Sequence, residues 1–313
     1  MKIFCWNMNY WENTRGKYDN IVDWKNKCIK YLFEEKSIDF YILQEINPIE
    51  VFEKDNQQYN NLLTDYEIIY HELTNELLYD GRKDNFWGNA ILFHKKYKLV
   101  NKNGLIDFNS VSKNYYGRNG IMAYEFLSEA NKKITIINYY NKKNYADRGE
   151  YIQKYFDKDN DIIDILENAN GGIVLAGDFN TGFTINGKDK YIQFIELYWD
   201  KYKVKDGIKN YSDDFIPSSY WRKKGQFYLN DYCFFKNFTN IKLLNYQNDW
   251  ININNTKYWK GLSDHRSFIY EINFDQIEKD DKLNYSTKET WTVEDEKETQ
   301  RVYESLKRKA GIQ

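Results

Sequence analysis

Cysteine, histidine and proline are all scarce in this sequence. Its 313 residues include three cysteines, three histidines and two prolines. The cysteines are scattered and form neither a Cys-x-x-Cys motif nor a Cys/His pairing, so we expect no disulfide framework and no structural zinc site. A histidine-rich metal site is equally unexpected.

Long apolar runs and targeting signals are also missing. No run reaches the roughly 18–20 residues of a membrane-spanning helix. The opening residues, MKIFCWNMNYW, show no basic segment followed by an apolar stretch and a cleavage site, so no secretion signal is visible. Because 42% of the residues are hydrophobic, the chain can bury a proper core. We therefore expect a globular, cytoplasmic protein without a membrane span.

The charge is nearly balanced, with 45 Lys and Arg against 47 Asp and Glu. A protein that coats nucleic acid would be strongly basic, whereas a nuclease can hold its substrate through a local basic surface. Aromatic residues are frequent, at 18%, with 29 tyrosines. Codon bias toward Lys, Asn, Tyr and Ile accounts for this composition, and surfaces that stack on bases are the alternative.

Short apolar and β-branched runs predict a protein dominated by strands. We predict strands at 2–6, 39–43, 66–70, 89–93, 121–126, 134–139, 171–176, 232–235, 241–246 and 268–272, with the four between 66 and 139 forming a meander. Apolar residues at helical spacing predict helices at 21–36, within 147–167 and at 192–198, and Pro48 starts another. This mixture suggests two sheets packed face to face with helices outside.

The chain shows no internal linker or repeat before Phe274. Beyond it, residues 275–313 are rich in charge and poor in large apolar side chains, and one solvated helix is predicted at 293–310. We expect a main domain at 1–274 and a surface tail without chemistry at 275–313.

Four short polar motifs stand where predicted strands end. They are Trp6-Asn7, Gln44-Glu45, Gly177-Asp178-Phe179-Asn180 and Ser263-Asp264-His265. Each motif alone is a weak signal, because an aspartate at a strand end is more often a turn or cap residue. The information lies in the set and its order along the chain.

In that order the motifs resemble those of the endonuclease/exonuclease/phosphatase superfamily, which includes exonuclease III-like and DNase I-like enzymes. The segments WGNAIL at 87–92 and NDYCFF at 230–235 are similar to two further strands of that family, and the SYW at 219–221 is similar to a segment that often precedes the second. The resemblance runs from Lys2 to about Ile272. It implies an α/β fold, a four-layer α/β sandwich of two packed mixed β-sheets flanked by helices.

The resemblance also implies a divalent metal. A phosphodiester repels an anionic nucleophile and needs its leaving oxygen stabilised, and a hard cation held by carboxylates serves both needs. Glu45 is the implied ligand, with Asn7 nearby, and Asp264 could join directly, through water or at a second metal. Oxygen ligands with several waters suit Mg²⁺, with Mn²⁺ possible.

Four further residues match the family's catalytic positions. Asp178 matches the general base, and Asn180 can orient the attacking water or a phosphate oxygen. Residues two apart in a strand share a face, so both can point into one cleft while Phe179 points into the core. A charged His265 can donate to a phosphate oxygen, and Asp231 matches the carboxylate that orients the imidazole and favours its charged form.

One position departs from part of the family. DNase I-like members often carry a histidine after the strand that corresponds to 134–138, where this chain has Asn138-Tyr139-Tyr140 and exonuclease III-like members use a tyrosine. We expect Tyr140 to contact phosphate. Tyr139 is the alternative register, and a tyrosine buried in the core is the other alternative.

Taken together, these residues predict a metal-dependent phosphodiesterase, most simply a nuclease that hydrolyses DNA or RNA by in-line attack of an activated water. The candidate substrate contacts are Arg118, Lys142 and Arg222 for phosphates and Tyr220 and Trp221 for bases. The sequence lacks segments typical of inositol phosphatases, secreted sphingomyelinases and abasic-site enzymes. A hydrolase of a non-nucleic phosphoester (phospholipid, nucleotide or sugar phosphate) and a catalytically silent binding module stay as alternatives.

Overall fold

The structure is a computed structural model that describes residues 1–9, 21–33, 37–46, 64–72, 88–105, 120–140, 161–168, 170–179, 205–206, 218–221, 226–228, 230–246, 250–253, 256–259, 263 and 265–273. The helices predicted after Pro48 and at 192–198 lie outside these ranges, and so does the predicted tail at 275–313.

Six strands form the first sheet. Their order across the sheet is β13 (Ile241–Tyr246), β16 (Phe268–Ile272), β1 (Lys2–Asn7), β2 (Phe40–Ile46), β4 (Gly88–His94) and β3 (Tyr66–Glu72). Only β1 and β2 run parallel, and every other neighbouring pair is antiparallel. A parallel pair needs a crossover connection, and helix α2 (Ile21–Leu32) lies in the chain between these two strands.

The second sheet repeats this plan. Its order is β5 (Lys98–Leu99), β6 (Gly120–Leu127), β7 (Lys133–Tyr140), β8 (Gly172–Asp178), β12 (Asp231–Lys236) and β9 (Lys205–Asp206). Here β7 and β8 form the parallel pair, with helix α7 (Asp161–Asn168) between them in the chain. The other pairs are antiparallel.

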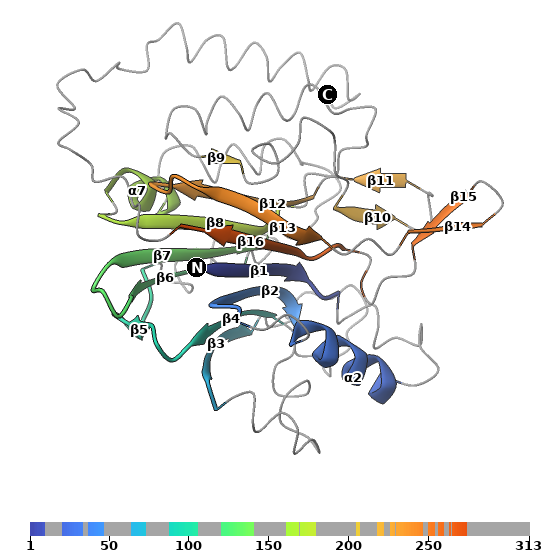
Figure 1. Ribbon diagram of the computed structural model, residues 1–313, viewed down its shortest axis with the longest axis horizontal. Coiled ribbons are helices and arrows are strands. Elements are labelled where there is room, and N and C mark those ends of the chain that lie inside the picture. Colours follow the sequence, from blue (N-terminus) through green and yellow to red (C-terminus); the bar gives the residue numbers. More distant parts are fainter. Residues whose placement is uncertain are drawn as a thin grey trace, which may run out of the picture.

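The two sheets pack face to face, with α2 outside the first and α7 outside the second (Figure 1). Strand β1 shows why. Its residues Ile3 and Cys5 join the core between the sheets, and its residues Phe4 and Trp6 pack in a second core with the buried side of α2. Successive side chains of a strand point to opposite faces, so a sheet covered on both faces needs a continuous apolar run. Burying each such side chain contributes about 1.5–3 kcal/mol.

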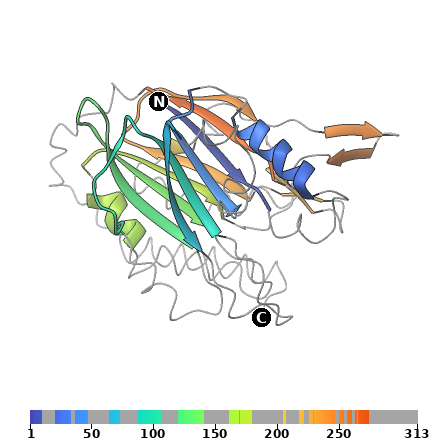
Figure 2. The ribbon, with the colours of Figure 1, turned by 90° about the horizontal axis from the view of Figure 1, so that it is seen from below.

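Two short antiparallel ribbons stand beside the sandwich. One pairs β10 (Ser219–Trp221) with β11 (Gln226–Tyr228), and the other pairs β14 (Trp250–Ile253) with β15 (Thr256–Trp259). Figure 2 shows the second ribbon projecting away from the sheets. Neither ribbon is predicted as paired strands from the sequence. Among the described residues no helix is both long and apolar enough to cross a membrane.

The predicted architecture of two packed mixed sheets with helices outside is confirmed. The predicted meander is wrong in its pairing. Strands β3 and β4 pair in the first sheet, whereas β6 and β7 pair in the second. Alternating or apolar runs locate strands but carry no information about which sheet a hairpin joins. Two strands also run further than predicted, so that Glu45 lies within β2 and Asp178 within β8.

Candidate active site

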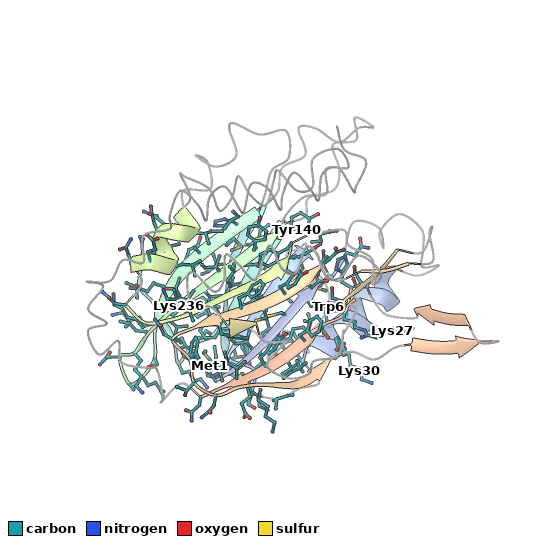
Figure 3. The ribbon with its side chains drawn as sticks, turned by 90° about the horizontal axis from the view of Figure 1, so that it is seen from above. Met1, Trp6, Lys27, Lys30, Tyr140 and Lys236 are labelled. Atoms are coloured by element: carbon teal, nitrogen blue, oxygen red, sulfur yellow. The ribbon has the colours of Figure 1, made fainter. Side chains whose placement is uncertain are left out.

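The carboxyl ends of the two parallel pairs meet at one end of the sandwich. Strands β1 and β2 pack against β7 and β8. In Figure 3, Trp6 and Tyr140 near the ends of β1 and β7 lie toward one end of the molecule, and Met1 and Lys236 lie toward the other. Polar side chains at the ends of strands from both sheets can therefore lie close together.

Asn7 joins the two sheets at this end. Its side chain is fully buried, and its Nδ2 donates to Glu45 Oε1 at 3.1 Å and to Asp178 Oδ2 at 2.9 Å. Its Oδ1 accepts a hydrogen bond from the backbone N–H of Asn9 at 2.9 Å. Since only the amide nitrogen can donate, the two carboxylates fix the orientation of the amide. Asn7 thus holds the carboxylates of Glu45 and Asp178 close to each other through hydrogen bonds to both.

Glu45 reaches Asn7 from an irregular point in β2. The register between β2 and β4 shifts between Leu43 and Ile46, and Glu45 has a φ of 49°. A non-glycine residue in this left-handed region is strained by about 1–3 kcal/mol and persists where the surrounding structure holds it. Such irregularities re-aim a side chain, and here the carboxylate of Glu45 turns toward the end of β1.

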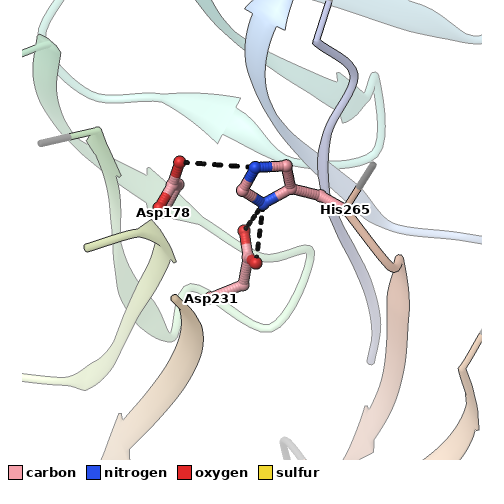
Figure 4. A group of neighbouring side chains, drawn as sticks. All are labelled: Asp178, Asp231 and His265. Atoms are coloured by element: carbon pink, nitrogen blue, oxygen red, sulfur yellow. Dashed lines mark hydrogen bonds and ion pairs between the residues drawn. The ribbon is translucent and has the colours of Figure 1, made fainter. Parts of the chain in front are cut away.

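His265 lies between two aspartates (Figure 4). Its Nδ1 is 3.0 Å and 2.8 Å from the two carboxylate oxygens of Asp231, and its Nε2 is 3.9 Å from Asp178 Oδ2. A carboxylate only accepts hydrogen bonds, so Nδ1 carries a proton. Asp178 is 1% exposed and His265 is 8% exposed. The imidazole is therefore oriented by Asp231 and presents Nε2 toward Asp178.

Two buried serines hold these groups in place. Ser218 Oγ accepts hydrogen bonds from the backbone N–H groups of Asn230 and Asp231, at 2.8 Å and 2.9 Å. Ser263 Oγ donates to the backbone carbonyl of Asn7 at 2.7 Å and accepts from the backbone N–H of His265 at 3.1 Å. Neither serine is among the predicted site residues. Ser263 stands in a recognised motif, but nothing in the sequence marks Ser218.

The two tyrosines at the end of β7 face opposite ways. Tyr140 lies opposite Asp178 in the parallel register and shares its face. Tyr139 is fully buried and stacks on Phe179 with ring centroids 4.4 Å apart. Phe179 thus points into the core, as the alternation in its motif predicts. Of the two registers, the arrangement favours Tyr140 as the residue beside the site.

Several predicted site residues lie outside the described part of the chain. These are Asn180, Asp264, Arg118, Lys142 and Arg222. Tyr220 and Trp221 lie in β10, of which the structure describes the backbone pairing with β11. Their roles stay predictions. The residues that the structure does bring together are Asn7, Glu45, Asp178, Asp231 and His265, with Tyr140 next to Asp178 in the sheet.

Solved structures share this architecture. No protein-family model matches the sequence, and no curated protein matches it either. The catalytic domain of human Nocturnin with bound sulfate aligns with a TM-score of 0.57 at 14% identity, over 87% of this chain and 93% of that one. An endonuclease/exonuclease/phosphatase family protein from Leptotrichia buccalis aligns with a TM-score of 0.53 at 17% identity, over 88% and 100%. TDP2 from D. rerio, complexed with single strand DNA product, aligns with a TM-score of 0.52 at 14% identity, over 87% and 98%.

At such low identities a structural match speaks for the fold and leaves the chemistry to the site. The matches extend over most of this chain and of each solved structure. They therefore cover more than a common fragment of the fold. The fold of this chain is that of the endonuclease/exonuclease/phosphatase superfamily.

Proposed function

We propose that this protein is a divalent-metal-dependent phosphodiesterase, and specifically a nuclease. The observation that carries the proposal is the position of Asp178. This buried carboxylate accepts a hydrogen bond from Asn7, which also binds Glu45, and lies 3.9 Å from the Nε2 of His265. One end of the sandwich thus combines a carboxylate that can accept a proton, an oriented imidazole and a second carboxylate.

Asp178 takes the role of general base in this proposal. The attacking water must lose its proton as it approaches phosphorus, and a positioned carboxylate accepts it. The hydrogen bond from Asn7 Nδ2 holds the carboxylate of Asp178 at the end of β8, where it faces the space between the sheets. Asn180, two residues further on, is proposed to orient the same water.

His265 is proposed to stabilise the charge that develops on the phosphate. Its Nδ1–H donates to Asp231, which favours the imidazolium form. In this proposal its Nε2–H, which faces Asp178 at 3.9 Å, donates to a phosphate oxygen when substrate is bound. A donor already in place needs no reorganisation during the reaction, which is why such groups contribute strongly. Tyr140, on the same face as Asp178, is proposed as a second phosphate contact.

The donor set around Asn7 fits a hard cation. Glu45 and Asp178 bring two carboxylates to one amide, and carboxylate oxygens are the ligands that Mg²⁺ and Mn²⁺ prefer. Glu45 would hold the ion, with Asn7 beside it and Asp264 as a further proposed ligand. When bound, such a cation polarises the phosphate and stabilises the leaving oxygen.

The carboxylates of Asp178 and Asp231 and the imidazole of His265 also offer ligand atoms within 4.8 Å of one another. We propose that these three residues act in proton transfer and phosphate binding rather than as metal ligands. The Nδ1 of His265 is already engaged by both oxygens of Asp231, so that the imidazole and this carboxylate satisfy each other. A metal that used all three residues as ligands would have to compete with the imidazole for the oxygens of Asp231.

Nucleic acid is the proposed substrate. The D. rerio TDP2 of similar fold is complexed with single strand DNA product, which supports a nucleic-acid backbone as the ligand of this site. In this proposal Arg118, Lys142 and Arg222 contact phosphates, and Tyr220 and Trp221 stack on bases.

A substrate panel tests the proposal. Purified protein is incubated with plasmid DNA, single-stranded DNA, RNA and a phosphatase reporter, each with Mg²⁺ or with EDTA. We expect Mg²⁺-dependent cleavage of at least one nucleic acid. Cleavage of the reporter alone would assign the site to a non-nucleic phosphoester, and metal-dependent cleavage of nothing would contradict a hydrolase.

A further inference from the structure

A buried pair of amides connects the two sheets directly behind the site. The Nε2 of Gln44 in β2 donates to the Oδ1 of Asn138 in β7 at 2.8 Å. Gln44 is 1% exposed and Asn138 is 0% exposed. Gln44 precedes Glu45, and Asn138 stands two residues before Tyr140, so the pair lies between the two strands that carry these site residues.

Asn138 also binds the backbone of the opposite sheet. Its Nδ2 donates to the carbonyl oxygens of Leu43 at 2.9 Å and Ala90 at 3.0 Å. With the bond from Gln44, the amide of Asn138 uses both of its N–H donors and its oxygen. A buried polar side chain satisfied in this way fixes a single arrangement, because any other would leave a buried group without its partner.

The two carbonyls mark the point where the first sheet becomes irregular. Leu43 and Ala90 face each other in the register of β2 and β4, and the next paired residues are Ile46 and Gly88. Glu45, with its φ of 49°, lies inside that interruption. Asn138, on the second sheet, thus donates hydrogen bonds to the last regularly paired residues of β2 and β4 before the register shift in the first sheet.

We propose that Asn138, supported by Gln44, is a positioning residue for Glu45. By holding the carbonyls of Leu43 and Ala90, it fixes the strand ahead of Glu45, so that this carboxylate stays beside Asn7 and Asp178. An unusual backbone conformation persists only where its surroundings hold it, and Asn138 donates hydrogen bonds to both strands at that point. The inference rests on the proposed function in one respect, which is that Glu45 holds a divalent ion.

Mn²⁺ binding measured by calorimetry without substrate tests the inference. The variant is Asn138→Leu, which keeps the approximate size of the side chain and removes its hydrogen bonds. We expect Mn²⁺ to bind about 10–100-fold more weakly, which is the usual effect of losing a group that orients a metal ligand. The Mg²⁺ concentration that half-saturates cleavage should rise similarly, while the KM for nucleic acid stays close to that of the wild type.

The matched control is Asn237→Gly. Asn237 also donates its side-chain amide to a carbonyl, that of Gly171 at 2.8 Å, but next to the opposite end of β12 from Asp231. Its φ of 63° is one that glycine accepts. We expect this variant to lose thermal stability without a change in Mn²⁺ affinity, so stability loss alone cannot produce the expected result.

Wild-type Mn²⁺ affinity in a folded Asn138→Leu protein would overturn the inference. Should that variant not fold, Gln44→Met replaces it, with an expected loss of affinity at the lower end of that range, about tenfold. Unchanged affinity there would overturn the inference as well. A wild-type protein that binds Mn²⁺ and cleaves none of the substrates would contradict the proposed function alone. A wild-type protein that binds no Mn²⁺ would contradict both.

Discussion

Asp231 and Asp178 lie opposite each other in the antiparallel register of β12 and β8, and His265 lies between their carboxylates. Two acids on adjacent strands would repel each other if both faced the same empty space. The imidazole separates them. Its Nδ1 binds Asp231 and its Nε2 faces Asp178, so each acid meets a different nitrogen and can take a different role.

The variant Asp231→Asn tests the role of the carboxylate behind the imidazole. The amide keeps the size of the side chain but removes the charge that favours the imidazolium form. We expect kcat to fall about 10²–10³-fold, the usual effect of losing a transition-state donor, with little change in KM. Steady-state kinetics on the cleaved substrate provide the measurement.

Glu125→Gln is the control for that variant. Glu125 on β6 forms an ion pair with Lys133 on β7, with 3.0 Å between Oε1 and Nζ, and the lysine is half-exposed. This pair lies outside the site. Its loss should change kcat by less than about twofold, because a surface ion pair contributes little to stability and this one includes no residue of the site. Equal losses in both variants would contradict a specific role for Asp231.

Asp178→Asn should separate proton transfer from substrate binding. An amide of the same shape cannot accept the proton of the attacking water at neutral pH. We expect kcat to fall about 10²–10⁴-fold, while the affinity for an uncleaved oligonucleotide in Mg²⁺, measured by fluorescence anisotropy, stays within a few-fold of the wild type. Undiminished turnover would remove Asp178 from the chemistry.

Much of the sandwich follows from patterns in the sequence. The continuous apolar runs around Phe4, Ile42 and Val174 predict strands covered on both faces, and they are the middle strands of the two sheets. The two-residue strands β5 and β9 leave no such pattern. They exist because a neighbouring edge offers hydrogen bonds, which is a property of the assembled sheet.

The site, too, could be predicted only in part from the sequence. The motifs place Asn7, Asp178 and His265 on strands or at strand ends, and the structure brings these three residues together. The left-handed φ of Glu45 and the buried amide of Asn138 have no counterpart in any local pattern. An asparagine within an apolar strand can equally face solvent, and only the packing of the second sheet onto the first shows that Asn138 is buried and bonded.

Gly177→Ala should destabilise the protein strongly. Gly177 has a φ of 147°, and a Cβ there would lie 1.8 Å from the carbonyl oxygen of Tyr139 on β7. The backbone of β8 would have to move away from β7 one residue before Asp178. We expect a loss of about 4 kcal/mol or more in the free energy of unfolding by urea, as for other severe steric conflicts in a core.

Gly104→Ala is the control variant, with which the loss of stability in Gly177→Ala is compared. Gly104 also has a positive φ, 76°, but its added Cβ would meet the Ala123 oxygen only at 3.1 Å. The cost there should be about 1–2 kcal/mol, that of an L residue in the left-handed region. A Gly177→Ala protein no less stable than Gly104→Ala would show that β7 and β8 can separate without penalty.

His71 should make stability depend on pH. It lies on β3, and its Nε2 is 2.6 Å from the hydroxyl of Tyr124 on β6. Burial lowers the pKa of His71 from its ordinary value of 6.5. Below about pH 6.5 the unfolded chain therefore binds a proton that the folded protein does not, and the free energy of unfolding falls as the pH falls. Above that pH the contribution of His71 is fully present.

Urea unfolding between pH 5.5 and 7.5 measures this dependence. In His71→Gln the decrease toward low pH should be smaller than in the wild type, because the titrating group is gone. Tyr124→Phe should keep most of the decrease, since burial rather than the hydrogen bond lowers the pKa of His71. Equal pH dependence in the wild type and His71→Gln would mean that His71 takes up a proton as readily in the folded sandwich as in the unfolded chain. The imidazole would then be hydrated in solution at the edge where β3 approaches β6.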